Sequence, residues 1–283
     1  MKAVAAPYLA LGDSIAAGTQ QPVPFTDNGY TGRLFKDLKD EYGFDTFVNL
    51  ACPGDDTREM LDGNYGSFCY GDSAFLPPGG SSQLAAALAY LVANPGEVKL
   101  ITLTMGANDI LGCNFATPAG IPCFFGALDQ IGANLTVILA ALQAAAPGVP
   151  IIAMNYYNSN LGFWPVDPAL ALSTQPLVPF FNGALAAVYG VFSVPVADVE
   201  TAFDTFDTNG KIPKNFRSIC KYTRMCAKQH GTYVQSLFET ATSGLQPDIH
   251  PTNKGYKQIA KTFSNLIEDL DLFDDDGGDS NDD

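Results

Sequence analysis

The sequence is poor in the residues that most metal and nucleotide sites require. It contains only two histidines, His230 and His250, and no C-x-x-C pair, which disfavours a zinc site. It also lacks the G-x-G-x-x-G pattern and the G-K-[ST] ending of a phosphate-binding loop. These absences disfavour zinc proteins and nucleotide-binding proteins as classes.

Long apolar runs are also missing. No uninterrupted run reaches the roughly 18 residues that a membrane span needs, so we expect no transmembrane segment. The N-terminus, MKAVAAPYLALG, lacks the apolar core of roughly 7–15 residues that a signal peptide contains. We interpret AVAA as what remains after signal cleavage, which is the expectation for a secreted, extracellular protein.

Basic residues are half as frequent as acidic ones, and the excess of acid is concentrated at the C-terminus. Nine acids and no base occur from Glu268 onward, which leaves 21 acids and 15 bases in the rest of the chain. An acidic surface disfavours nucleic acid as a partner. We expect one domain over residues 1–271 and a disordered acidic tail over 272–283. The alternative for the tail is weak calcium binding, because DLFDDDGGDSNDD resembles the Asp/Gly-rich calcium repeats of secreted proteins.

The six cysteines lie along the chain as three pairs of near neighbours. Fifteen connectivities are open to six cysteines, and pairing between near neighbours is the most economical one. Three disulfides would indicate an oxidising compartment, in agreement with export. The candidates are Cys52, Cys69, Cys113, Cys123, Cys220 and Cys226.

Segments with the pattern of buried strands alternate with segments of helical periodicity. This alternation predicts a parallel sheet of about five strands covered on both faces, a three-layer α/β/α sandwich. The predicted strands are residues 7–11, 46–51, 98–104, 150–155 and 194–196, and the predicted helices are 30–42, 83–92, 128–146, 180–189 and 254–270.

Polar and small residues follow the first three predicted strands. Ser14 follows the first strand, Gly54 the second, and Asn108 and Asp109 the third. The carboxyl ends of parallel strands share one edge of a sheet, so the three turns should open together. Each residue also has a simpler interpretation, because Ser14, Asn108 or Asp109 could cap a helix and Gly54 could serve a turn.

A nucleophilic serine needs a base, and His250 is the better candidate. It lies in PDIHPTNKGY, just before the last predicted helix, with Asp248 beside it. His230 has no acid beside it and is interpreted as structural. The main-chain N–H groups of Ser14 and Gly54 and the side-chain amide of Asn108 are candidate donors to an oxyanion.

Four blocks in this order resemble the SGNH, or GDSL, hydrolase family. They are GDS at 12–14, Gly54 in NLACPGDDT, GAND at 106–109 and the histidine of DIHP, and the style of the first block is most similar to secreted actinobacterial members. The resemblance implies a flavodoxin-like fold and esterase or lipase activity without metal or organic cofactor. It makes Ser14 the nucleophile, His250 the general base, and Ser14, Gly54 and Asn108 the oxyanion hole.

One position departs from the family pattern. The aspartate expected three residues before the histidine is replaced by Pro247, and Asp248 lies only two residues before His250. In an extended segment residues i and i+2 share a face, so Asp248 can still be the residue that orients the imidazole. The alternative is a main-chain carbonyl, of Pro247 or Asp248, in that role.

The segment 155–181, rich in aromatic residues and proline, follows the fourth predicted strand. Its place at the same edge predicts a wall that meets an apolar acyl chain, so a lipid or simple ester is the expected substrate. An acetylated carbohydrate, with the protein as an O-deacetylase, is the first alternative. A non-catalytic extracellular binding module on this fold is the second.

Overall fold

The computed structural model describes residues 6–63, 69, 81–115, 117–165, 167–226 and 248–273. Three features singled out from the sequence therefore lie wholly or largely outside the described residues: the AVAA segment except for Ala6, His230 and the carbonyl of Pro247. The calcium alternative for the tail rests largely on residues 274–283, which also lie outside them.

Five parallel strands form one sheet in the order β2-β1-β3-β4-β5, which confirms the predicted α/β architecture. The central strands are buried because both faces of the sheet are covered, and Tyr8 to Leu11 of β1 are completely inaccessible. Some buried hydroxyls inside this core are paired, as in the 2.7 Å hydrogen bond between Tyr8 and Thr102, whereas the buried hydroxyl of Tyr189 has no partner among the described residues. The strands are β1 (Pro7–Gly12), β2 (Thr46–Asn49), β3 (Leu100–Thr104), β4 (Ile151–Met154) and β5 (Val196–Ala197).

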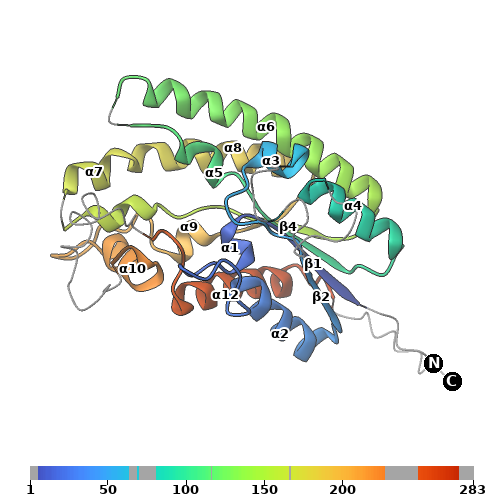
Figure 1. Ribbon diagram of the computed structural model, residues 1–283. Helices are drawn as coiled ribbons and strands as arrows, with labels where there is room; N and C mark the ends of the chain where they lie inside the picture. Colours follow the sequence, from blue (N-terminus) through green and yellow to red (C-terminus); the bar gives the residue numbers. More distant parts are fainter. Residues whose placement is uncertain are drawn as a thin grey trace.

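Helices cover both faces of the sheet (Figure 1). On one face α2 (Tyr30–Tyr42) lies beside α12 (Asn253–Asp269), where the rings of Tyr30 and Phe263 stack with centroids 4.8 Å apart. The other face carries α3 (Thr57–Asp62), α4 (Gln83–Ala93), α6 (Gly120–Ala145) and α8 (Val178–Val191). The shorter helices are α1 (Ser14–Ala17), α5 (Ala107–Leu111), α7 (Pro168–Ser173), α9 (Val199–Ala202), α10 (Lys214–Tyr222) and the 3₁₀ turns η1 (Ser159–Phe163), η2 (Gln175–Leu177) and η3 (Arg224–Cys226).

The predicted start of α6 is wrong by eight residues, since the helix begins at Gly120 rather than at Leu128. Its first turn contains Pro122, which interrupts a helical pattern when the sequence is read. In the first turn, however, the missing N–H of proline would have no intrahelical partner anyway, so the residue is tolerated there. The short helices α1, α3, α5, α7, α9 and α10 were not predicted, because most are too short to show a period.

Helix α6 bears on the expectation that the chain has no transmembrane segment. Among the described residues it is the one helix long and apolar enough, by length and composition, to cross a membrane, with a mean hydropathy of 1.5 in its most apolar window. Its residues Ile131, Leu135, Ile138 and Leu142 are inaccessible, whereas Val137 is 55% exposed. This spacing of three and four residues is that of an amphipathic helix with one face on a protein core.

All three predicted local disulfides are present. Cys52 pairs with Cys69, Cys113 with Cys123, and Cys220 with Cys226. None of the six cysteines lies in a strand of the sheet. The bonds therefore fix turns and helix ends outside the sheet.

Candidate active site

The turn after β1 places Ser14 at the start of a helix without using its hydroxyl. Gly12 has a φ of +141°, and a Cβ there would lie 2.2 Å from the carbonyl oxygen of Thr104, so only glycine fits. Asp13 is the N-cap of α1 and accepts a hydrogen bond of 2.8 Å from the N–H of Ile15. The cap is therefore Asp13, which removes the simpler interpretation of Ser14.

Asp13 is buried on the inner side of this turn. Only 2% of it is exposed, and its second carboxylate oxygen accepts a hydrogen bond of 2.8 Å from the hydroxyl of Tyr156. Burial raises the pKa of Asp13 to about 6, although the hydrogen bonds from Ile15 and Tyr156 act against that shift. The carboxyl group thus holds the turn and has no free oxygen directed outward.

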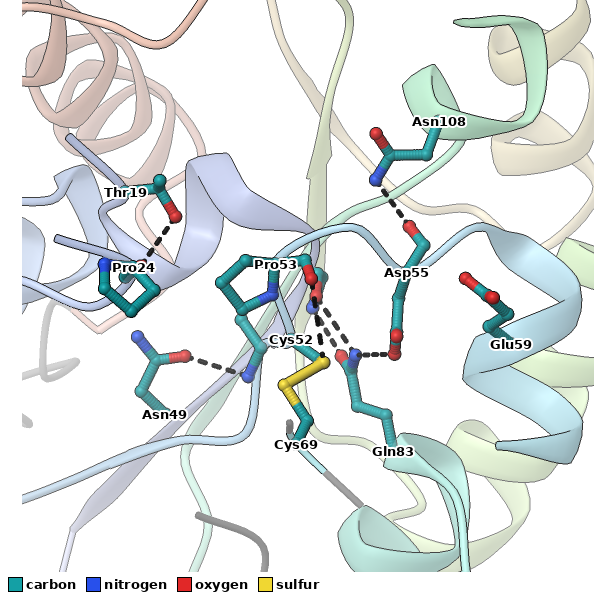
Figure 2. The surroundings of a disulfide bond; sticks show 12 residues. Thr19, Pro24, Asn49, Cys52, Pro53, Asp55, Glu59, Cys69, Gln83 and Asn108 are labelled. Atoms are coloured by element: carbon teal, nitrogen blue, oxygen red, sulfur yellow. Dashed lines mark hydrogen bonds between the residues drawn. A yellow bond between two sulfur atoms is a disulfide. The ribbon is translucent and has the colours of Figure 1, made fainter. Parts of the chain in front are cut away.

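The turns after β2 and β3 lie at the same edge, because these strands flank β1. Gly54 is exposed and has a φ of +94°. Asn108, half-buried in α5, donates a hydrogen bond of 2.7 Å to the carbonyl of Asp55, the residue that follows Gly54. Figure 2 shows Asn108 directed toward Asp55. Within the described part of the chain the N–H groups of Ser14 and Gly54 donate no hydrogen bond.

Neither Asn108 nor Asp109 caps the helix in which it lies. The N-cap of α5 is Gly106, which makes no side-chain cap hydrogen bond. Asp109 instead accepts hydrogen bonds from the hydroxyl of Thr57 at 2.5 Å and from its N–H at 3.0 Å, which ties α5 to the start of α3. Burial raises the pKa of Asp109 to about 6.

His250 and Asp248 form a close pair. The distance from Nδ1 of His250 to Oδ1 of Asp248 is 2.6 Å, and the N–H of His250 donates to the same oxygen at 3.0 Å. Burial acts to raise the pKa of Asp248, but the hydrogen bonds from His250 and the charge of Arg224 outweigh it, so the pKa lies below its usual value. An ionised carboxylate only accepts hydrogen bonds, so Nδ1 carries the proton and Nε2 is free to accept one.

An apolar pocket of about 380 Å³ connects the two halves of this site. Ile15 and Ile249, the neighbours of Ser14 and His250, both line it, and Phe124 and Phe181 form part of its wall. No hydrogen bond joins Ser14 to His250 among the residues that the structure describes. Several residues of the segment 155–181, which was predicted to be a wall, line the pocket.

The part of the chain that the structure describes contains no group of three or more histidine, cysteine, aspartate or glutamate side chains arranged to hold a metal ion.

The sequence matches the model of the GDSL-like lipase/acylhydrolase family over residues 10–258. The chain belongs to this family. The resemblance found in the four sequence blocks is thereby confirmed. No curated protein matches the chain.

Solved structures of lipases share the fold. An extracellular lipase from Streptomyces rimosus and a phospholipase A1 from Streptomyces albidoflavus are each 15% identical, with a TM-score of 0.58 over 92% of this chain and 99% of theirs. A lipase from a goat rumen metagenome is 16% identical, with a TM-score of 0.56 over 92% of this chain and 96% of its own. These three structures support the overall fold described above.

Two residues at the site of this GDSL-family protein were missed in the sequence. Nε of Arg224 lies 2.5 Å from Oδ2 of Asp248, and the N–H of Arg224 donates to the carbonyl of His250 at 2.9 Å. Gln83 is inaccessible and bonds to both Gly12 and Asp55. Both residues are far in sequence from what they contact, so neither belongs to a local motif.

Proposed function

We propose that this protein is a serine hydrolase of carboxylic esters that acts through an acyl-enzyme. The observation that carries the proposal is the Asp248–His250 pair, with its 2.6 Å hydrogen bond, beside the pocket that Ile15 and Ile249 share. Ser14 is the nucleophile in this proposal, His250 is the general base, and Asp248 orients the imidazole.

The reaction has two steps. Oγ of Ser14 attacks the ester carbonyl carbon while its proton passes to Nε2 of His250, and His250 then returns that proton to the leaving alkoxide, which departs as an alcohol. Water attacks the acyl-serine in the same way, giving the carboxylic acid and restoring Ser14. The N–H groups of Ser14 and Gly54, with the amide of Asn108, stabilise the oxyanion in both steps.

The pocket favours an ester with an apolar acyl chain over an acetyl ester. Its volume of about 380 Å³ greatly exceeds an acetyl group, and aromatic and aliphatic side chains form most of its wall. Its polar side chains are largely engaged, since the hydroxyl of Thr174 donates to Asn158 and accepts from Asn160, each at 3.3 Å. Asn158 also donates at 2.8 Å to Gln175, which lies outside the lining. These groups are therefore poorly placed to bind a sugar.

Export from the cell belongs to the same proposal. Three disulfides require an oxidising compartment to form and persist, and the described cysteines are all paired. An ester-hydrolysing protein in that compartment would meet extracellular lipid or simple ester substrates.

A fluorophosphonate probe and p-nitrophenyl acetate, butyrate and palmitate test the activity. We expect wild type to be labelled at Ser14 and to hydrolyse the esters, and S14A to do neither. The pocket serine variant S159A is the matched control, and it should be labelled like wild type. The longer esters should be hydrolysed with a higher kcat/KM than the acetate.

A folded wild-type protein with three disulfides that is neither labelled nor active would contradict the proposal. That outcome would favour the non-catalytic binding module. A clear preference for acetyl esters would instead favour the carbohydrate O-deacetylase.

A further inference from the structure

One buried amide joins two of the turns that carry the site. Gln83 is the first residue of α4 and is completely inaccessible. Its Oε1 accepts a hydrogen bond of 2.6 Å from the N–H of Gly12, and its Nε2 donates to the carbonyl of Gly12 at 3.0 Å and to Oδ2 of Asp55 at 3.2 Å. Figure 2 shows the Gln83 side chain directed at Asp55, with Asn108 on the far side of that residue.

The amide of Gln83 takes the place of a peptide group in the sheet. The register of β1 with β2 ends where Ala10 faces Asn49, and beside Gly12 the chain after β2 keeps one ladder bond, from the N–H of Cys52 to the carbonyl of Gly12 at 2.9 Å. The N–H of Gly12 would otherwise face the next carbonyl of β2. Gln83 supplies that carbonyl from its side chain, and this releases the chain after β2 to form the turn that carries Gly54.

Asp55 relays the contact to the third turn. Its carboxylate accepts the hydrogen bond from Gln83, and its main-chain carbonyl accepts the 2.7 Å hydrogen bond from Asn108. One continuous set of hydrogen bonds therefore runs from the residue two before Ser14, through the residue after Gly54, to Asn108. These are the three turns that hold the oxyanion donors.

We propose that Gln83 is a positioning residue that, together with Asp55, sets the three oxyanion donors relative to one another. The inference rests on the proposed function. Gln83 makes no contact with the acyl pocket, whose lining does not include it. Its effect is therefore on the transition state, where donors must lie about 2.7–3.1 Å from the oxyanion, and not on acyl-chain binding.

This role is tested by measuring whether loss of the Gln83 amide changes kcat while leaving KM nearly unchanged. Replacing Gln83 with leucine keeps the volume but removes all three hydrogen bonds. We expect Q83L to lower kcat for p-nitrophenyl butyrate about 10- to 100-fold, somewhat less than loss of one donor itself, with KM changed less than twofold. A trifluoromethyl ketone, whose adduct with serine mimics the tetrahedral intermediate, should bind more weakly by a similar factor.

The neighbouring residue supplies the matched control. Ser82 is the N-cap of α4, and among the described residues its hydroxyl accepts only the hydrogen bond from the N–H of Ala85, at 3.2 Å, so S82A perturbs the same helix end without touching the turns. We expect S82A to keep the wild-type kcat and ketone affinity.

Two variants of Asp55 keep the test informative if Q83L does not fold. D55A breaks the relay but leaves both bonds between Gln83 and Gly12 in place, and it should lower kcat with KM unchanged. D55N still offers an oxygen to Nε2 of Gln83, so it should restore most of the lost kcat.

The outcomes separate the two proposals. If wild type hydrolyses esters but folded Q83L or D55A keeps kcat within twofold, or changes KM alone, the positioning role is wrong and the proposed function stands. If wild type is inactive toward the esters and the fluorophosphonate probe, the proposed function fails and this inference fails with it.

Discussion

The site contains two buried aspartates whose pKa values move in opposite directions. Asp13, under the turn of Ser14, is 2% exposed, and its pKa rises to about 6. Asp248, behind His250, is 6% exposed, and its pKa lies below the usual value. Both side chains are nearly inaccessible, but burial removes Asp13 more completely from water, and the partners differ as well. Neutral donors, the N–H of Ile15 and the hydroxyl of Tyr156, surround Asp13, whereas Arg224 and His250 surround Asp248.

The comparison extends to the two sides of the site. On the side of the nucleophile, main-chain groups, the amides of Gln83 and Asn108 and the carboxylate of Asp55 connect the three turns, and none of these contacts is an ion pair. The side of His250 depends on charge, since an ion pair fixes the carboxylate that fixes the imidazole. The nucleophile side is therefore expected to be less sensitive to salt than the acid–base side.

The largest loss of kcat should come from replacing Asp248, the carboxylate that bonds to His250. Asparagine can present its N–H₂ to Nδ1 of His250 and so favour the wrong tautomer, which should lower kcat by about 10³- to 10⁴-fold. Steady-state kinetics on D248N, with the fold checked by circular dichroism, measures this. D198N, at an exposed helix cap after the outermost strand β5, is the control and should keep full activity. Retention of most activity by D248N would show that Asp248 does not orient His250.

The pH dependence of stability should separate the two aspartates. Because the pKa of Asp13 rises from 3.8 to about 6 on folding, the folded state holds this proton more tightly than the unfolded state. The free energy of unfolding therefore falls as pH rises from about 4 to 6, by up to about 3 kcal/mol relative to D13N. Urea unfolding of both proteins across this range measures the difference.

Asp248 should show the opposite sign. Its pKa is lowered on folding, so the stability it contributes is present above its unfolded pKa and is lost as pH falls through the lower folded value. D248N should lack that loss in acid.

A stability difference between wild type and D13N that stays constant over pH 4–6 would contradict the assignment for Asp13.

A smaller effect is expected at Arg224. Its guanidinium bonds to Asp248 and also to the carbonyl of Gln21 at 2.9 Å, but about 30% of its side chain is exposed. Loss of a charged hydrogen bond that solvent partly screens should lower kcat about tenfold in R224M. R224K keeps the charge without the second bond and should lie between R224M and wild type. Equal kcat values in all three proteins would show that Asp248 needs no support from Arg224.

The sequence predicted the features that depend on short-range patterns. Residues 30–42 form the helix with the predicted bounds, and all five strands lie within two residues of their predicted ends or inside them. The glycine of GDS was also informative, because Gly12 packs against Thr104 too closely for any side chain. Period and turn chemistry act over a few residues, so both can be found without a structure.

Contacts between distant segments could not be predicted. Gln83 lies at the start of an Ala/Leu helix. Nothing in the local sequence distinguishes a side-chain amide that bonds to the main chain of a strand from one that faces water. Arg224 reaches Asp248 across 24 residues, most of which lie outside the described part of the chain. The position of Asp248 depends on that contact. The sequence alone therefore left both Asp248 and a main-chain carbonyl as candidates for the group that orients His250.

The disulfides lie beside the site and not within the sheet. Cys52 is two residues before Gly54, Cys113 lines the pocket, and Cys226 is two residues after Arg224. Reduction would therefore loosen the turns that position the reacting groups while leaving the buried strands in place. A reducing agent such as dithiothreitol should inhibit this protein at concentrations that do not denature it. Reoxidation of the cysteines should then restore activity without refolding.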